Sequence, residues 1–155
     1  MKKVYIGIDA HKDSNSFALA FSGREAPVFH AKVSTDLNRT VEAIRKIQKQ
    51  YELEKEDLAL CYEAGPTGFV LARRLIHLGY DCIVVAPSKI PVKSGDRLKT
   101  DRRDAKKLAG LHRAGELTAV NVPDVEDEVI RDVCRGRTDA VNELVRTKPW
   151  SEAER

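Results

Sequence analysis

Near its beginning the chain alternates apolar and polar side chains with a period of two, which is typical of half-buried β-strands. Every second residue from Val4 to Ile8 is apolar, and comparable stretches follow at residues 16–21 and 28–33. The polar run at residues 10–15 is predicted to be the first turn. Because the connections are short, we predict three strands in an antiparallel meander.

Beyond residue 34 the apolar positions take the spacing of an α-helix, and short apolar runs then alternate with further helical stretches. Thr35 or Asp36 is placed to cap the first helix, and Gly79 is placed to end the second. We predict, in order, a helix at 37–51, a strand at 57–62, a helix at 69–78, a strand at 82–85, and helices at 101–114 and 126–146.

This order of elements is that of the ribonuclease-H-like fold, an α/β fold with a mixed sheet. Three antiparallel strands come first, and parallel strands with flanking helices follow them. We predict that residues 1–120 form this domain and that residues 121–155 form a helical arm with a terminal tail. The apolar stripe of the arm is typical of the start of a coiled coil, so we expect it to pair in a homo-oligomer.

Composition places the chain among globular proteins of one-domain size. It has 155 residues, 42% of them apolar and 33% charged, with a net charge of +3. No stretch has the length of apolar sequence that a membrane span needs, and the first twenty residues lack a signal-peptide pattern. The three cysteines have no CxxC spacing. We therefore expect a cytoplasmic protein with reduced thiols and no membrane contact.

Four acidic residues are the candidate chemistry. Asp9 and Glu63 end the first and fourth predicted strands, which are neighbours in this fold, and Asp101 and Asp104 lie one turn apart at the start of a helix. Four converging carboxylates would bind Mg²⁺, with Mn²⁺ as a substitute, for phosphoryl transfer. Asp13 is an alternative to Asp9 but lies beyond the strand end. Acids in a first helical turn are also favoured by the helix dipole, so a capping role is the alternative for that pair.

A basic segment surrounds two of these acids. Residues 89–107 hold eight lysines and arginines against three acids, whereas the rest of the chain is slightly negative. Such a segment is typical of nucleic-acid binding, and a solvated loop is the alternative. The residues that we expect to contact phosphates are His11, Lys12, Thr67, Lys89, Lys93, Arg97, Lys99, Arg102 and Arg103.

Three stretches carry a resemblance to a known family. Gly-Ile-Asp-Ala-His-Lys at 7–12, Tyr-Glu-Ala-Gly-Pro-Thr-Gly at 62–68 and Lys-Thr-Asp-Arg-Arg-Asp-Ala at 99–105 resemble motifs of the DEDD transposases of the insertion-sequence 110 group, which includes the pilin-gene invertases. The resemblance covers about residues 4–120 and corresponds to the amino-terminal, Holliday-junction-resolvase-like domain. It implies Mg²⁺ bound by Asp9, Glu63, Asp101 and Asp104, and action on DNA in transposition and recombination.

The family also implies partners. Some members are directed by a structured guide RNA, and full-length members carry a further domain with a serine nucleophile. We expect this chain to lack that domain, and Ser151 in the terminal tail is not expected to replace it. Strand cleavage and exchange should therefore need a separately supplied serine domain, so that this chain would be an incomplete recombinase.

Three other functions are alternatives to this one. A non-catalytic nucleic-acid-binding module would need the basic segment alone, and a stand-alone junction nuclease would use the acids with water. An ATP-dependent kinase or actin-like ATPase shares the fold, but it needs a glycine-rich phosphate loop after Asp9. The sequence at residues 10–13 is not such a loop.

Overall fold

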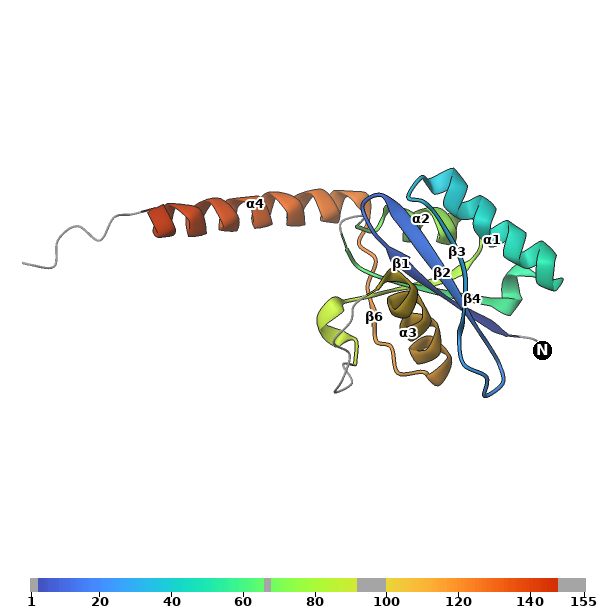
Figure 1. The fold of residues 1–155 in the computed structure, drawn as a ribbon. Helices are drawn as coiled ribbons and strands as arrows, with labels where there is room; N and C mark the ends of the chain where they lie inside the picture. The colour runs from blue at the N-terminus through green and yellow to red at the C-terminus, as the bar shows by residue number, and fades with distance from the viewer. Residues whose placement is uncertain (1–2, 66–67, 92–99, 148–155) are drawn as a thin grey trace, which may run out of the picture. The chain divides into compact units, whose positions relative to one another are not determined.

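The computed structural model describes residues 3–65, 68–91 and 100–147 (Figure 1). Its contacts divide the chain into two compact units, Met1–Val122 and Pro123–Arg155. The first unit holds a mixed β-sheet with flanking helices. The second holds one long helix.

The sheet of the first unit has six strands among the described residues, in the order β3-β2-β1-β4-β5-β6. Strands β1, β2 and β3 form an antiparallel meander, β4 and β5 continue from β1 in parallel, and β6 is antiparallel to β5. This arrangement confirms the predicted ribonuclease-H-like order, with the first strand central and the fourth beside it. The strand bounds are Val4–Ala10 for β1, Ser14–Phe21 for β2, Val28–Ser34 for β3, Leu58–Glu63 for β4, Asp81–Val85 for β5 and Ala119–Val120 for β6.

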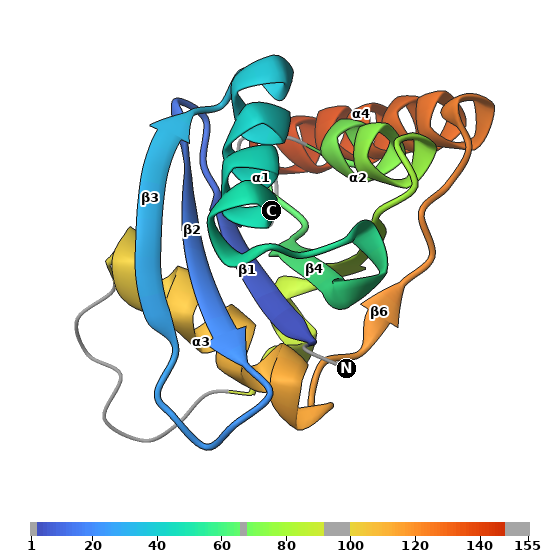
Figure 2. The same cartoon turned by 90° about the vertical axis from the view of Figure 1, so that its right-hand side faces the viewer.

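Helices cover both faces of this sheet. Figure 2 shows α1 (Leu37–Tyr51) and α2 (Val70–His77) on one face and α3 (Asp101–Ala114) on the other. Two short 3-10 helices, Lys55–Asp57 and Pro87–Lys89, precede β4 and follow β5. Asp36 caps α1 as predicted, because its side chain accepts a hydrogen bond of 2.9 Å from the Arg39 amide.

The two faces of the sheet are packed differently. The face under α1 and α2 is a core of large apolar side chains such as Ile8, Phe17 and Ile44, all fully buried. The face under α3 consists largely of small residues. The buried alanines there are Ala18, Ala20, Ala105 and Ala109. Small side chains let the backbone of α3 approach the sheet closely, as the strand residue Gly7 also shows.

Two details differ from the predicted elements. Strand β2 begins at Ser14, inside the segment predicted to be a turn, because Asn15 pairs with Ala10 of β1. Burying the polar Asn15 side chain is tolerated because its amide donates a hydrogen bond of 2.8 Å to Thr40 Oγ1. Strand β6 was not predicted, since two residues are too few to show a period.

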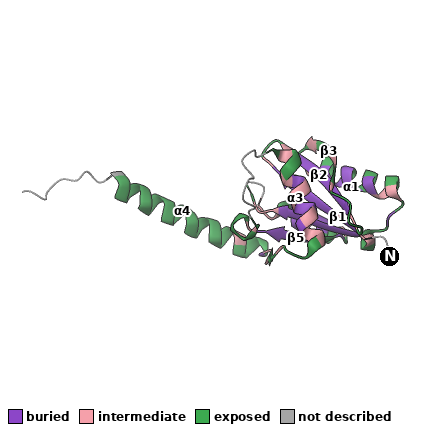
Figure 3. Ribbon diagram, turned by 60° about the horizontal axis from the view of Figure 1, so that its bottom comes forward, coloured by how far each residue is buried: buried purple, intermediate pink, exposed green. Residues whose placement is uncertain are grey.

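The second unit contains α4 (Val125–Thr147), which confirms the long helix predicted there. Asp124 accepts a hydrogen bond of 2.8 Å from the Asp127 amide and so caps the start of the helix. Figure 3 shows exposed residues along the length of α4, in contrast to the buried strands of the first unit. The apolar residues left exposed include Val129, Ile130, Val133, Val141 and Leu144. None of the described helices is both long enough and apolar enough to cross a membrane.

Candidate functional site

Asp9 and Glu63 end neighbouring parallel strands. Ile8 of β1 pairs with Tyr62 of β4, so the next residues, Asp9 and Glu63, lie side by side at one edge of the sheet. Asp9 is buried, with 5% of its surface exposed, and Glu63 is half-buried. The sequence predicted this adjacency from the element order, and the strand register agrees with it.

Both acids lie on the face that α3 covers. Gly7 of β1 lies against the backbone of α3. The Cys61 thiol of β4 donates a hydrogen bond of 3.6 Å to the Leu108 carbonyl oxygen of α3. Side chains alternate along a strand, so the residues two positions later, Asp9 and Glu63, point to the same face.

Helix α3 begins at this edge of the sheet. Thr100 caps it, with its hydroxyl oxygen accepting a hydrogen bond of 3.3 Å from the Arg103 amide. Asp101 and Asp104 follow in the first turn. Because Ala105 lies against Gly7, Asp101, one turn earlier, comes out near Asp9.

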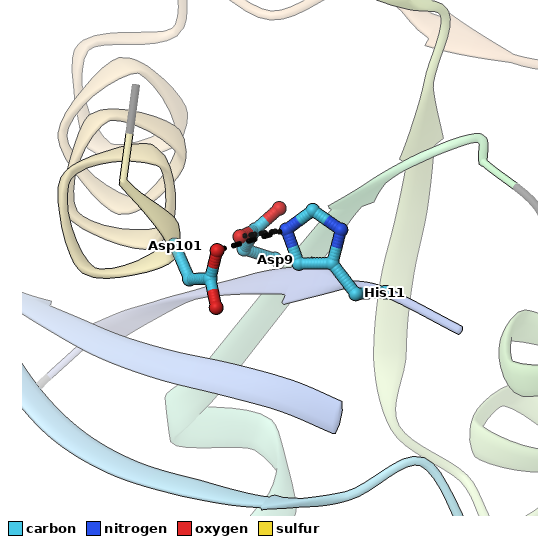
Figure 4. A group of neighbouring side chains, drawn as sticks. All are labelled: Asp9, His11 and Asp101. Atoms are coloured by element: carbon cyan, nitrogen blue, oxygen red, sulfur yellow. Dashed lines mark ion pairs between the residues drawn. The ribbon is translucent and has the colours of Figure 1, made fainter. Parts of the chain in front are cut away.

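The structure brings Asp9 and Asp101 together around His11 (Figure 4). One side-chain ligand atom from each of the three residues lies within 4.8 Å of the other two. His11 Nε2 is 2.8 Å from Asp9 Oδ2 and 3.3 Å from Asp101 Oδ1. His11 was expected to contact phosphate, and in this structure it contacts the carboxylates.

Lys32 of β3 is a further member of this group, and it was missed by the sequence analysis. Its Nζ lies 2.6 Å from Asp101 Oδ2. The two residues are 69 positions apart in the sequence. The alternating pattern of residues 28–33 predicts a strand, but it does not predict which distant residue Lys32 contacts. No signal in the sequence distinguishes it from other exposed lysines.

Burial and neighbouring charges shift the pKa values of Asp9 and Asp101 in opposite directions. Burial raises the pKa of Asp9 above its ordinary value; the positive charge of His11 lowers it in part, and the negative charges of Asp104 and Asp101 raise it further. The hydrogen bond from Lys32 is the main reason that the pKa of Asp101 is lowered. The site therefore holds one carboxylate that is costly to ionise and one that a cation keeps ionised.

Buried oxygen atoms without a hydrogen bond make this arrangement suitable for a cation. Asp9 Oδ2 and Asp104 Oδ2 are both buried and accept no hydrogen bond from any described residue, although Asp9 Oδ2 has the ion pair with His11. Buried polar atoms normally have partners, and adjacent carboxylates repel. A divalent cation held by Asp9 would supply such a partner, so the carboxylates present fit a metal of the kind that prefers oxygen ligands.

Comparisons with known proteins identify the family. The family model for DEDD transposases of the insertion-sequence 110 group, described as a transposase, matches residues 6–150. This chain belongs to that transposase family. A protein of Sinorhizobium fredii named as a transposase, y4qE, is 49% identical over 143 residues, which cover 92% of this chain and 36% of that protein.

A further relative of this chain is less similar. The transposase for insertion sequence element IS1533 of Leptospira borgpetersenii is 39% identical over 142 residues, which cover 88% of this chain and 38% of that protein. The chain thus spans a little over a third of the length of these curated relatives. Among solved structures, the Thermus thermophilus RuvC structure is similar with a TM-score of 0.48 and 12% identity, covering 76% of this chain and 99% of that one.

The other two predicted acids, Glu63 and Asp104, lie outside the close group around His11. Neither Glu63 nor Asp104 contributes an atom to the group within 4.8 Å that joins Asp9, His11 and Asp101. Asp104 nevertheless acts on Asp9 through its charge, and it lies half-buried in the same helical turn as Asp101. The assignment of Glu63 as a metal ligand stays a prediction that rests on its position at the end of β4.

Two of the predicted phosphate contacts, Arg102 and Arg103, lie in the first turn of α3. The Arg102 guanidinium carbon lies 4.4 Å from the centre of the Phe29 ring, which holds this side chain against β3. Arg102, Arg103, Lys12 and Lys89 are exposed. The remaining predicted contacts, Thr67, Lys93, Arg97 and Lys99, lie outside the described residues.

Proposed function

We propose that this chain is the metal-binding domain of a DNA transposase and that it positions DNA phosphates for strand cleavage and exchange. The observation that carries the proposal is the meeting of Asp9 and Asp101, from the end of β1 and the start of α3. The buried Oδ2 atoms of Asp9 and Asp104, which accept no hydrogen bond from the described residues, support it. Membership of the transposase family supports DNA as the substrate.

The proposed metal ligands are Asp9, Glu63, Asp101 and Asp104, with Mg²⁺ as the ion and Mn²⁺ as a substitute. A divalent cation bound there would stabilise the negative charge that develops on a phosphodiester during its cleavage. The chain's own contribution is geometric. The short distance between β1 and α3 fixes the separation of Asp9 and Asp101, and burial of Asp9 keeps its carboxylate out of bulk water.

Positive side chains at the start of α3 would hold the DNA backbone. Arg102 and Arg103 follow Asp101 directly and are exposed, so their guanidinium groups can reach phosphates next to the acids. Such contacts carry no base information. We therefore expect binding to be weak, largely independent of DNA sequence and strongly dependent on salt.

The remaining parts of the activity are proposed to come from outside the described site. The nucleophile of strand transfer would be a serine on a further domain, and a structured guide RNA would direct the choice of DNA. Helix α4 exposes Val129, Val133 and Leu144, which supports its pairing with a second copy in a homo-oligomer. We expect these steps to take place in the cytoplasm.

The test combines metal and DNA binding. Titration of the purified chain with Mn²⁺, followed by electron paramagnetic resonance of the free ion, should give a binding curve that Asp9→Asn abolishes. Asp81→Asn is the matched control. Asp81 is the first residue of β5 and so lies at the opposite end of the parallel strands from Asp9, and it forms an ion pair with Lys3 at 4.0 Å. Equal Mn²⁺ binding by the wild type and Asp9→Asn would refute the proposed site.

A non-catalytic nucleic-acid-binding module is the second candidate, because exposed arginines at the start of α3 would serve it without any metal. Anisotropy of a labelled four-way DNA junction separates the two. Binding that Mn²⁺ strengthens in the wild type but not in Asp9→Asn supports the transposase site. Binding that is the same with Mn²⁺ and with EDTA supports the simple module.

A further inference from the structure

Lys32 completes a row of polar side chains across three strands. Asp9 of β1 pairs with Ser16 of β2, and Ser16 pairs with Lys32 of β3. Directly paired residues point to the same face of a sheet, so Lys32 lies on the α3 side together with the candidate ligands. This register brings the Lys32 ammonium to the start of α3, where it meets Asp101.

Asp101 is held by two groups at once. Lys32 Nζ is 2.6 Å from Asp101 Oδ2, and His11 Nε2 is 3.3 Å from Asp101 Oδ1. Both oxygens of a proposed metal ligand are thus occupied by nitrogen groups of the protein. The Lys32 side chain is 52% exposed, and ion pairs this exposed contribute little to stability. A contribution to the stability of the fold therefore does not explain the ion pair between Lys32 and Asp101.

We propose that Lys32 is a displaceable counter-cation, bound to Asp101 in the metal-free protein and transferred to a DNA phosphate when a divalent cation binds Asp101. The inference rests on the proposed function and extends it to a residue of β3. A divalent cation on Asp101 would repel the ammonium, and the long lysine stem lets that group move to the solvent side of the site. On that side the ammonium, on a side chain that is 52% exposed, can contact a DNA phosphate.

The first test measures competition between Lys32 and the metal. Without DNA, Lys32→Met should bind Mn²⁺ about three- to tenfold more tightly than the wild type, because no ammonium has to be displaced. Lys32→Gln should behave in the same way, and Lys32→Arg should remain close to the wild type. Lys46→Met is the matched control, since Lys46 pairs with Glu42 at 3.1 Å on α1, on the other face of the sheet.

The outcomes separate this inference from the proposed function. If the wild type binds Mn²⁺ and Lys32→Met binds it equally or more weakly, the counter-cation role is refuted and the metal site stands. If the wild type binds no Mn²⁺, both are refuted. Thermal melting of each variant verifies that it is folded before the titration.

The second test follows the transferred charge. With saturating Mn²⁺, binding of a labelled DNA duplex should depend less steeply on salt in Lys32→Met, by about one unit in the slope of log affinity against log salt concentration. Lys46→Met should keep the wild-type slope. An unchanged slope in Lys32→Met would refute the transfer of Lys32 to phosphate.

Discussion

Gly7 of β1 lies directly against Ala105 of α3. A Cβ atom on Gly7 would overlap the Ala105 carbonyl oxygen and the Ala109 amide nitrogen, and it would lie 3.0 Å from Leu108 Cβ. Any side chain at position 7 would therefore push the helix away from the sheet. Because Asp101 lies one turn before Ala105 and Asp9 lies two residues after Gly7, this contact sets the distance between the two acids.

Replacing Gly7 by alanine should therefore damage both the fold and the site. We expect Gly7→Ala to lower the free energy of unfolding by about 1–3 kcal/mol, since backbone atoms of α3 cannot move aside without shifting the helix. Urea denaturation measures this loss, and Mn²⁺ titration of the folded variant should show weaker binding.

Gly136→Ala is the control for the glycine substitution. Gly136 lies in α4, and no described atom is within 4 Å of a Cβ placed there. Alanine in a helix interior is about 0.5–1 kcal/mol more favourable than glycine, so this variant should gain helical stability. A Gly7→Ala variant as stable as the wild type would show that α3 is not held at this distance.

Asp9→Asn should have opposite effects with and without metal. Because burial raises the pKa of Asp9 above 3.8, this group favours folding below its ordinary pKa, and that contribution is lost as the pH rises through the raised value. At neutral pH in EDTA the buried, ionised carboxylate of Asp9 therefore lowers the stability of the folded state. The melting temperature of Asp9→Asn should then equal or exceed that of the wild type.

With Mg²⁺ or Mn²⁺ the order of stability should reverse. A cation that binds only the folded state raises the wild-type melting temperature, and Asp9→Asn should lose most of this rise. Differential scanning fluorimetry in EDTA and over a series of Mn²⁺ concentrations measures both effects. A metal-induced rise of the same size in the two proteins would contradict the assignment of Asp9 as a ligand.

The sequence predicted the elements of the first unit well because their apolar periods are regular. It also predicted that Asp9, Glu63, Asp101 and Asp104 would converge, since the fold order places them at one edge of the sheet. The structure brings Asp9 and Asp101 together, and the four-acid metal site stays a prediction. It did not predict Lys32 or Gly7, whose importance depends on which residues of distant segments face them. Such contacts are set by strand register and helix distance, and neither is encoded in a local pattern.

A buried polar contact connects the segment around His11 to α1. Asn15 Nδ2 donates a hydrogen bond of 2.8 Å to Thr40 Oγ1, and Thr40 donates one of 2.9 Å to the Asp36 carbonyl oxygen. Thr35 donates one of 3.0 Å to the His11 carbonyl oxygen. The connection between β1 and β2, which carries His11, is therefore fixed to the start of α1.

Thr40→Val should destabilise the protein although it keeps the shape of the side chain. It leaves the buried Asn15 amide without its acceptor, which costs about 1–3 kcal/mol. Thr40→Ser keeps the hydroxyl group that accepts this hydrogen bond, so its free energy of unfolding should fall less than that of Thr40→Val. Chemical denaturation of the two variants gives the comparison, and a valine variant at least as stable as the serine variant would contradict this role.

The three cysteines should differ sharply in reactivity. Cys61 and Cys82 are buried, and burial raises the pKa of both thiols, that of Cys82 to about 12, so almost no thiolate is present at pH 8. Cys134 is exposed. A thiol reagent should modify Cys134 alone in the native protein and all three cysteines after denaturation, and Cys134→Ser should remove the native reaction. Fast native labelling of a second thiol would contradict the buried positions.

The proposed ligands Asp9 and Asp101 are about ninety residues apart, near the beginning of the first unit and in the last helix of that unit. An ion held by both would act as a cross-link that closes most of this unit into a single loop, and the entropy of closing a loop rises with its length. The ion would thus tie β1 to α3 and oppose the separation of the two ends of the unit. Resistance of the packed strands and helices of this unit to proteolysis would then depend on the metal supply of the cell as well as on the packing of the sheet.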